Sequence, residues 1–362
     1  MKDAAGNDAK ELTPFERRWR ASIESGELTR RYRELSYRQN LPLRDKIKLS
    51  EERIHEWFEA FDGKVSVSFS GGKDSCALLH LVRRLYPETP AVFCNTGLEY
   101  PEILNLIRQT PNTETVRPKK PFHHVIRDCG WPIISKKVAL GLSVLKNPTD
   151  GNQNIYRLYD IGINRFGQSV SGFRVPVRWR FLINSPFKIS DKCCSVMKKE
   201  PMRRYERLTG YVQFVGTMAS DSKQRQKTYL QFGCNSFDSK TPRSAPLSFW
   251  TTQDVIQYIA MKEVPYAKVY GDIRRNASGE LYFSGVQSTG CVFCVFGLHM
   301  EQAPNRFQQM AETHPKLFDY CMNRLGLADV LDWTREHCPN RKIAAKFRYE
   351  PTKIYRQMEL FG

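Results

Sequence analysis

The chain has 362 residues, of which 41% are hydrophobic and 12% aromatic, so it can bury a large core and we expect a folded globular protein. It shows neither a signal-like apolar run near its start nor an apolar stretch of membrane length, so we expect a cytoplasmic protein without a membrane segment. In that compartment the ten cysteines are expected as thiols or metal ligands. The formal charge of +18 favours a polyanionic partner, although a solvated basic surface explains it equally well.

The first 49 residues are rich in arginine, and their apolar residues recur without a steady helical period. We interpret residues 1–49 as a basic, helical N-terminal extension. Ser50 then precedes Ile54, Trp57 and Phe58, whose spacing places them on one face of a helix. Because serine is a favoured N-cap residue, this helix is expected to begin at Ser50.

A strand–helix–strand pattern follows. Residues 64–69 are strand-like, residues 76–85 are helical, and residues 91–94 form a short apolar strand. The pattern returns with a strand at 212–215 and a helix that ends at Ile259. We therefore predict an α/β protein with a parallel sheet flanked by helices, which binds its ligand at the carboxyl ends of the strands.

The expected organisation has three parts. Residues 50–260 form the α/β domain, and residues 138–190, which mix turn signals with aromatic and basic residues, form an insertion near its ligand site. Residues 261–362 carry a Cys-x-x-Cys motif and are helical toward their end.

The hexapeptide Ser70-Gly-Gly-Lys-Asp-Ser75 lies between the first strand and the following helix. Its glycines let backbone amides approach an anion, and the helix N-terminus adds a positive dipole. Lys73 can offset phosphate charge, Asp74 can hold Mg²⁺, and the two serines can donate hydrogen bonds. The loop is not a Walker A motif, because Asp74 follows the lysine and Val67 replaces a required glycine. An ordinary tight turn is the alternative, which the strand–loop–helix context disfavours.

Four cysteines form a second constellation. Cys193 and Cys194 are adjacent, and 96 residues separate Cys194 from Cys291, the first cysteine of the pair Cys291 and Cys294. Thiolates favour zinc or an iron–sulfur cluster over hard cations, and this spacing alone does not choose between them. Adjacent cysteines suit a cluster better than a compact tetrahedral zinc site. Buried thiols without a metal are the remaining interpretation.

On these motifs the sequence resembles the PP-loop ATP pyrophosphatase superfamily, whose fold is that of the adenine nucleotide alpha hydrolases, and within it the phosphoadenosine phosphosulfate (PAPS) reductase family. The resemblance covers most of residues 50–300. Besides the loop it rests on residues 95–102, on residues 216–225 and on residues 246–255, which look like the family's Pro-Leu, Trp-Thr and Asp-Val signature. The cysteine pattern resembles the Cys-Cys and Cys-x-x-Cys motif of adenylylsulfate (APS) reductases, which implies a [4Fe-4S] cluster.

The resemblance and the loop together give a set of expected site residues. Lys73, Asp74 and Arg225 are expected to act in catalysis. The nucleotide is expected to contact Ser68, Ser70, Gly71, Gly72, Lys73, Asp74, Ser75, Asn95, Thr96, Gly97, Gly216, Ser220 and Asp221.

Two departures from the reductases direct the functional hypothesis. The sequence from Tyr355 to Gly362 has no counterpart of the reductases' C-terminal nucleophilic cysteine, and the loop keeps the Gly-Gly-Lys-Asp of relatives that split ATP. The resemblance therefore implies an adenylating enzyme of the sulfurtransferase kind, which cleaves ATP to pyrophosphate and an adenylate with Mg²⁺. A cysteine desulfurase is an expected sulfur donor.

Two alternatives remain open. One is a sulfonucleotide reductase that uses Cys338 or a partner's thiol, and the other is a nucleotide-binding module without turnover. For the adenylating enzyme the expected acceptor is tRNA or DNA, because arginines are dense in residues 17–48 and because Arg174, Arg178, Trp179, Arg180 and Phe181 interleave cations with aromatic rings. The competing interpretation is that this last run packs the insertion against the core.

Overall fold

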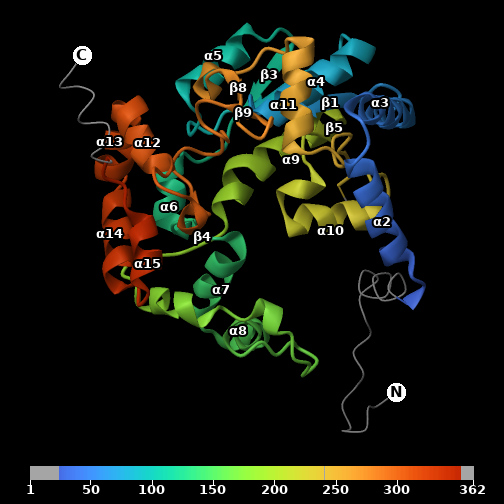
Figure 1. Ribbon diagram of the computed structural model, residues 1–362. Helices are drawn as coiled ribbons and strands as arrows, with labels where there is room; N and C mark the ends of the chain where they lie inside the picture. Colours follow the sequence, from blue (N-terminus) through green and yellow to red (C-terminus); the bar gives the residue numbers. More distant parts are fainter. Residues whose placement is uncertain (1–23, 240, 352–362) are drawn as a thin grey trace, which may run out of the picture. The chain divides into compact units, whose positions relative to one another are not determined.

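The computed structural model describes residues 24–239 and 241–351 (Figure 1). The chain divides into two compact units. Unit 1 comprises residues 1–95, 99–117 and 202–290, and unit 2 comprises residues 96–98, 118–201 and 291–362. Within the described ranges, no helix is long and apolar enough to cross a membrane.

Unit 1 is built on a six-stranded sheet. Its strands lie in the order β3 (Thr113–Val116), β2 (Ala91–Cys94), β1 (Val65–Ser68), β5 (Val212–Val215), β7 (Arg243–Ser244) and β6 (Asn235–Ser236). All neighbours pair in parallel except β6 and β7. The central strand β1 is buried on both faces, as expected for a parallel sheet covered by helices.

The order of the strands creates a switch point at β1. The chain leaves β1 through a helix to β2 on one side, whereas β5 pairs with the other side of β1. In such sheets the connections diverge at this point and leave a crevice at the carboxyl ends of the strands. The loops after Ser68 and Val215 therefore start at the same edge, since these two residues are register partners.

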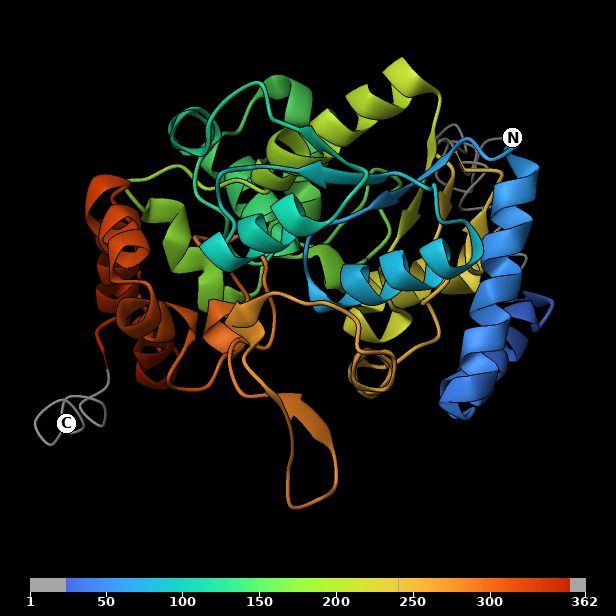
Figure 2. The same cartoon turned by 90° about the horizontal axis from the view of Figure 1, so that it is seen from above.

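Helices surround this sheet (Figures 1 and 2). They are α2 (Glu27–Gln39), α3 (Leu43–Ala60), α4 (Lys73–Leu85), α5 (Pro101–Gln109), α9 (Glu200–Thr209, which begins in unit 2), α10 (Lys223–Phe232) and α11 (Thr252–Lys262), with the short 3₁₀ helices η5 (Ala219–Asp221) and η6 (Lys268–Tyr270). A hairpin of β8 (Ile273–Arg275) and β9 (Leu281–Phe283) projects beside them in orange in Figure 2. The predicted α/β class with a parallel sheet is confirmed.

Helix α3 corrects one detail of the sequence analysis. It begins at Leu43, after Pro42, so Ser50 lies in its middle and is not its N-cap. Ser50 is fully buried, accepts a hydrogen bond from Trp250 Nε1 at 2.9 Å and donates one to Pro246 O at 2.9 Å. A serine inside a helix was mistaken for a start signal because its tertiary partners lie about 200 residues away in the chain.

Unit 2 is mainly helical. Its helices are α6 (Phe122–Cys129), α7 (Lys136–Lys146), α8 (Gln153–Asp160), α12 (Arg306–Thr313), α13 (Pro315–Asp319), α14 (Leu327–His337) and α15 (Arg341–Ala344). Shorter 3₁₀ segments are η1 (Asp150–Asn152), η2 (Ser171–Phe173), η3 (Val177–Asn184), η7 (Leu298–Met300) and η9 (Ala345–Phe347), and the π-helices are η4 (Ser195–Lys199) and η8 (Tyr320–Arg324). Strands β4 (Ile133–Ile134) and β10 (Val295–Phe296) pair in parallel.

The unit boundaries differ from the three parts expected from the sequence. Residue 260 lies inside unit 1, whereas the expected insertion at 138–190 lies wholly within unit 2. Of the basic extension, residues 24–49 are helical over most of their length and residues 1–23 lie outside the described part. The C-terminal residues 355–362 also lie outside it.

Candidate functional site

Two glycines shape the loop that follows β1. Gly71 has a φ of 71°, in the left-handed region that favours glycine, and a Cβ there would lie 2.8 Å from Ile103 Cγ2. A Cβ on Gly216, in the loop after β5, would lie 3.0 Å from Asp74 O. The predicted loop residues 70–75 and Gly216 are therefore brought together, with no room for a side chain between the two backbones.

Hydrogen bonds of the Ser75 side chain stabilise the loop of residues 70–75. Its Oγ donates to Gly72 O at 2.8 Å and accepts from Ser70 N at 3.2 Å. The hydroxyls of Ser70 and Ser75 also lie 3.2 Å apart. Ser75 therefore holds the loop in shape, whereas Ser70 is exposed and is the serine that can reach a ligand.

The N-terminus of α4 has features that favour an anion. The helix begins at Lys73, has 13 residues and has no side-chain cap. Unpaired N–H groups and the helix dipole both attract negative charge at such an end. The ammonium of Lys73 lies 3.2 Å from both carboxylate oxygens of Asp74, and its side chain is only 10% exposed.

The environment of Asp74 fits a cation. Burial raises the pKa of its carboxyl, Lys73 and Arg225 oppose that shift, and the charge of Asp221 adds to it. Its Oδ1 is buried and accepts no hydrogen bond, although Lys73 Nζ lies 3.2 Å away at an unfavourable angle. Two carboxylates within electrostatic reach, one with an open oxygen, suit Mg²⁺, which binds one or two carboxylates together with substrate phosphates.

Asp221 and Arg225 come from the loop and helix that follow β5. Asp221 Oδ2 accepts a hydrogen bond from Met218 N at 3.0 Å, and the Arg225 guanidinium pairs with the same carboxylate. Arg225 is exposed on its other side. Arg225 thus lies within electrostatic range of Asp74 in the loop of residues 70–75, and Asp221 is its ion-pair partner.

Tyr270 and Thr289 are site residues that the sequence analysis missed. Tyr270 Oη accepts a hydrogen bond from Lys73 N at 3.0 Å and is 2.9 Å from Thr289 Oγ1. Burial raises the pKa of Tyr270 to about 12, so the phenol stays protonated at neutral pH. A Cβ on Gly72 would lie 3.2 Å from Thr289 Oγ1, which explains the second glycine of the loop. No local pattern marked these residues, since they meet the loop only through the fold.

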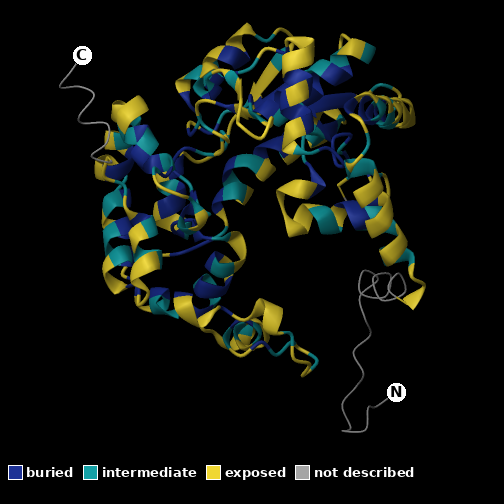
Figure 3. Ribbon diagram, in the orientation of Figure 1, coloured by how far each residue is buried: buried dark blue, intermediate teal, exposed yellow. Residues whose placement is uncertain are grey.

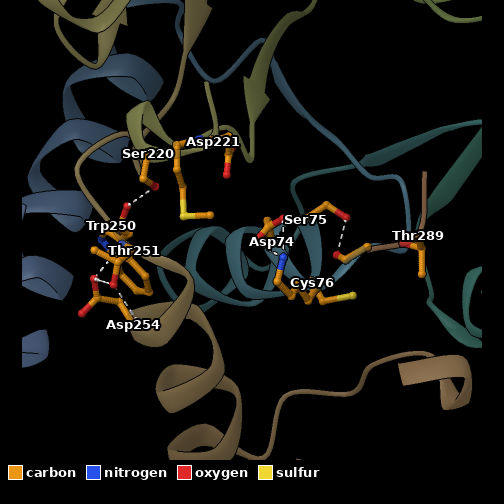
Figure 4. A network of polar contacts seen from close by, with 12 residues as sticks. Asp74, Ser75, Cys76, Ser220, Asp221, Trp250, Thr251, Asp254 and Thr289 are labelled. Atoms are coloured by element: carbon orange, nitrogen blue, oxygen red, sulfur yellow. Dashed lines mark hydrogen bonds and ion pairs between the residues drawn. The ribbon is translucent and has the colours of Figure 1, made fainter. Parts of the chain in front are cut away.

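A polar network supports the loop after β5 (Figure 4). Ser220 Oγ donates to Trp250 O at 3.2 Å, and Ala219 N donates to Ser248 O at 2.7 Å. The indole of Trp250 in turn donates to Ser50. Ser220 is therefore held by the backbone of the Trp-Thr signature that the sequence analysis singled out.

A buried ion pair completes this network. Lys46 Nζ lies 2.6 Å from Asp254 Oδ2, with side chains that are 2% and 11% exposed. Asp254 also accepts from Thr251 N and Thr251 Oγ1, which closes the capping box of α11. Lys46 also donates to Gln39 O at 2.7 Å. The pair joins α3 to the start of α11.

The remaining residues that are predicted to bind the nucleotide are divided between the two units. Ser68 ends β1, and Asn95, which follows β2, donates its N–H to Val116 O in unit 1. Thr96 and Gly97 belong to unit 2, where Gly97 has a φ of 74°. Their predicted contact with the nucleotide stays a prediction.

The four predicted ligand cysteines all belong to unit 2. Cys291 and Cys294 close a tight turn, in which Cys294 N donates to Cys291 O at 3.0 Å, immediately before β10. Arg306 Nη1 donates to Cys294 O at 2.9 Å and fixes this turn from α12. Cys193 and Cys194 precede a π-helix, whose wider winding is common at functional sites.

The four thiols lie within electrostatic range of one another. Burial raises the pKa of Cys193, and the charges of Cys291, Cys194 and Cys294 raise it further. Burial likewise raises the pKa of Cys294 to about 11, with Cys291 and Cys194 adding to the shift. Metal coordination would relieve this cost by replacing protons with a cation.

The neighbouring thiols do not have the spacing of ligands on one ion. Across residues 24–239 and 241–351, no group of three or more His, Cys, Asp or Glu is arranged to hold a metal ion. Thiolates on one zinc lie about 2.3 Å from the metal, whereas the thiolates of a cluster bind separate irons and lie farther apart. A donor set of four buried or half-buried, mutually coupled thiols is chemically suited to a cluster.

The aromatic and basic run of the insertion is mostly packing. Trp179 is 1% exposed and its ring meets His299 at a centroid distance of 5.0 Å, while Phe181 stacks on Trp333 at 6.2 Å. Arg180 pairs with Asp160. Trp179 is buried, so it cannot stack on a base, whereas Phe181 is half-buried against Trp333. Arg174 and Arg178 are exposed, and the predicted nucleic-acid partner stays a prediction.

The chain matches the model of the phosphoadenosine phosphosulfate reductase domain over residues 64–120 and 176–296. These segments include the loop after β1, the loop after β5 and all four predicted ligand cysteines. The stretch between them, residues 121–175, lies outside the match.

Two curated relatives and one solved structure are similar. The chain is 24% identical over 285 residues to an uncharacterized protein of Methanocaldococcus jannaschii, which covers 76% of this chain but only 53% of that protein, so the chain spans about half of it. It is 22% identical over 263 residues to adenosine 5'-phosphosulfate reductase of Staphylococcus epidermidis, covering 71% of this chain and 83% of that enzyme. The phosphate complex of phosphoadenylyl-sulfate reductase from Candida auris has 15% identity and a TM-score of 0.34, covering 60% of this chain and 82% of its own; at this score the likeness carries no argument.

Proposed function

Because this chain belongs to the phosphoadenosine phosphosulfate reductase family, we propose that residues 70–75 bind an adenylyl nucleotide and that the chain acts on it as a sulfonucleotide reductase-like or related PP-loop enzyme. The observation that carries the proposal is the N-terminus of α4, whose N-cap Gly72 offers no side-chain acceptor, with Lys73 in its first turn, at the switch point of the sheet.

The named relatives favour sulfonucleotide reduction. The Staphylococcus epidermidis relative is an adenosine 5'-phosphosulfate reductase, and the matched domain is named for the same kind of substrate. In this chemistry a thiolate attacks the sulfur, the bond from sulfur to the phosphate oxygen breaks, and AMP leaves with that oxygen. A second thiol then displaces sulfite and forms a disulfide, so a dithiol supplies the two electrons.

The described residues assign no exposed nucleophile to that reaction. Cys338, the candidate from the sequence, is 8% exposed, and its Sγ donates to Asn340 O at 3.5 Å. A buried thiol with a backbone partner attacks slowly. Sulfonucleotide reduction by this chain is therefore proposed to use the thiol of a partner protein.

A second reaction is favoured by the Lys73–Asp74 pair. ATP bound at α4 would present its phosphates to Lys73, and Asp74 and Asp221 would hold Mg²⁺. An acceptor oxygen attacks the α-phosphorus, the bond to the bridging oxygen breaks, and pyrophosphate leaves. Lys73 and Arg225 stabilise the negative charge that develops on the phosphates. Bound Mg²⁺ supplies Lewis-acid stabilisation of the leaving pyrophosphate.

We further propose that Cys193, Cys194, Cys291 and Cys294 hold a [4Fe-4S] cluster. Their mutual coupling within unit 2 supports a shared metal site. The adjacency of Cys193 and Cys194, which suits a cluster better than a compact tetrahedral ion, favours the cluster over zinc. A bound cluster supplies either electron transfer or sulfur chemistry. This chain's own contribution is the Cys291–Cys294 turn, which Arg306 fixes through the backbone.

Product analysis separates the candidate reactions. The full chain, purified without oxygen, is incubated with Mg²⁺ and ATP, and separately with adenosine 5'-phosphosulfate and a dithiol protein reductant. Sulfite and AMP from the sulfonucleotide identify the reductase reaction, and pyrophosphate from ATP identifies the adenylating reaction. Nucleotide binding without either product contradicts an enzymatic role and leaves a binding module, and failure to bind any adenylyl nucleotide contradicts the proposal entirely.

A further inference from the structure

Unit 2 carries a basic surface that the nucleotide chemistry of unit 1 does not use. Residues 136–180 contain eight lysines and arginines but only two aspartates, and one of these, Asp160, is already paired with Arg180. Six of the cations are exposed and form no ion pair within the described part of the chain. We call them the basic face: Lys136, Lys137, Arg157, Arg165, Arg174 and Arg178.

Contacts join several parts of the basic face. Lys137 Nζ, at the start of α7, lies 5.2 Å from the ring centroid of Phe173 in η2. The next residue, Arg174, donates through Nε to Asp160 O at the end of α8, at 3.2 Å. Helices α7 and α8 also pack on one another. The segment around α8 is largely exposed, as Figure 3 shows.

Aromatic rings lie among these cations at the surface. Phe173 is 47% exposed, with Lys137 over its ring. Phe166 is half-buried, with the Arg165 guanidinium 4.6 Å from its centroid. Val177, beside Arg178, is 71% exposed. Cations neutralise phosphates, and an exposed aromatic ring can stack on a base, so this combination suits a ligand that is both anionic and flat.

From this arrangement we propose that the basic face binds a single-stranded nucleic acid. Its phosphates take the place of the missing acidic partners of the six cations, and an unpaired base stacks on the exposed part of Phe173. A duplex presents phosphates but no open base face, so it lacks the second interaction. The proposal goes beyond the nucleotide site of unit 1 and does not depend on which reaction that site performs.

The test is fluorescence anisotropy with labelled oligonucleotides of about 20 nucleotides, a length chosen to exceed the few nucleotides that one site contacts. Single-stranded DNA, RNA of the same sequence and the matching DNA duplex are titrated with the full chain over a series of salt concentrations. Single-stranded DNA and single-stranded RNA are both expected to bind more tightly than the DNA duplex. For each of them, log affinity should fall linearly with log salt concentration.

Variants locate the contact. The double variant Lys137→Glu and Arg174→Glu should weaken single-strand binding at least tenfold. Its plot of log affinity against log salt should be less steep, by the amount that the loss of about two phosphate contacts predicts. Phe173→Ala should weaken it about 5- to 150-fold, the range for one stacked base, whereas Phe173→Tyr should restore it because the ring remains. The control is the double variant Lys316→Glu and Arg324→Glu, at an exposed lysine of α13 and an exposed arginine of η8. It makes the same change in charge and should bind like the wild type.

Thermal unfolding of each variant confirms that these surface changes leave the fold intact. Three results overturn the proposal. They are equal affinity for duplex and single strand, equal loss in the Lys316→Glu and Arg324→Glu control and in the Lys137→Glu and Arg174→Glu variant, or no binding of any oligonucleotide at low salt. The first result would contradict the stacking contact. The second would show that the basic face is not the binding site, and the third would show that nucleic acid is not the ligand.

Discussion

Tyr270 gives the phosphate loop a partner that is not another loop residue. Its hydroxyl accepts from the backbone N–H of Lys73 and contacts the hydroxyl of Thr289, while its ring is fully buried. Thr289 precedes Cys291 by two residues in the chain. The loop that is proposed to bind phosphate is therefore positioned by the segment that leads into the Cys-x-x-Cys motif.

Replacing Tyr270 by phenylalanine should destabilise the protein. The change leaves Lys73 N buried without an acceptor, which costs about 1–3 kcal/mol. Urea denaturation of Tyr270→Phe measures the loss, and Tyr282→Phe, at an exposed tyrosine of β9, is the control that should change little. Equal unfolding free energies in the two variants would show that the hydroxyl does not hold the loop.

At the same scale, the site was only partly readable from the sequence. The turn of residues 70–75 between β1 and α4 could be predicted, because its glycines and its flanking strand and helix are local in the chain. The role of Tyr270 was not predictable, because the loop residue that it contacts, Lys73, lies 197 residues away. Trp179 was misread for a related reason: the sequence shows a ring beside cations, but burial against His299 is decided by the tertiary fold.

Among the elements, α3 and α11 are joined by an interaction that propensity does not reveal. Lys46 is 2% exposed and reaches the carboxylate that caps α11. The sequence placed the helix start at Ser50, although α3 begins at Leu43 and includes Lys46. The strands and the helix of the βαβ unit were easier to predict from the sequence, since β1, α4 and β2 each follow a strong apolar pattern.

Removing Lys46 should be costly. Lys46→Met leaves Asp254 buried without its cation, which typically costs about 3–5 kcal/mol. Lys48→Met, two residues along the same helix but exposed, should change the unfolding free energy by no more than about 0.5 kcal/mol. Chemical denaturation of both variants tests this. A Lys46→Met protein as stable as Lys48→Met would mean that the pair contributes nothing to the joint between α3 and α11.

For the molecule as a whole, the two units are interleaved in the chain. The backbone passes between them near residues 95–99, 117, 201 and 290, so a division into consecutive segments was bound to differ from the observed one. The phosphate loop belongs to unit 1 and the four cysteines belong to unit 2. Long-range contacts decide such a division, and no composition change in the sequence marks them.

Iron and sulfide content test the chemistry of unit 2. Anaerobically purified protein should be brown and contain iron and acid-labile sulfide near four each per chain, as a [4Fe-4S] cluster requires. Cys291→Ser should lose both, whereas Cys321→Ala, at a fully buried cysteine of η8, should keep them. A colourless protein with one zinc per chain contradicts the cluster.

The central claim is that residues 70–75 of unit 1 bind an adenylyl nucleotide through Lys73. An equilibrium titration of the full chain with ATP and with adenosine 5'-phosphosulfate tests it most directly, using Lys73→Met beside Lys64→Met. Lys64 is exposed and precedes β1, at the end of the strand opposite to the loop of residues 70–75. Lys64→Met therefore removes the same charge as Lys73→Met, but away from the proposed site. A charge-assisted contact is worth about 1.5–3 kcal/mol, so Lys73→Met should raise the dissociation constant about 10- to 150-fold and Lys64→Met should not. Equal affinities in the two variants, or no binding by the wild type, would contradict the claim.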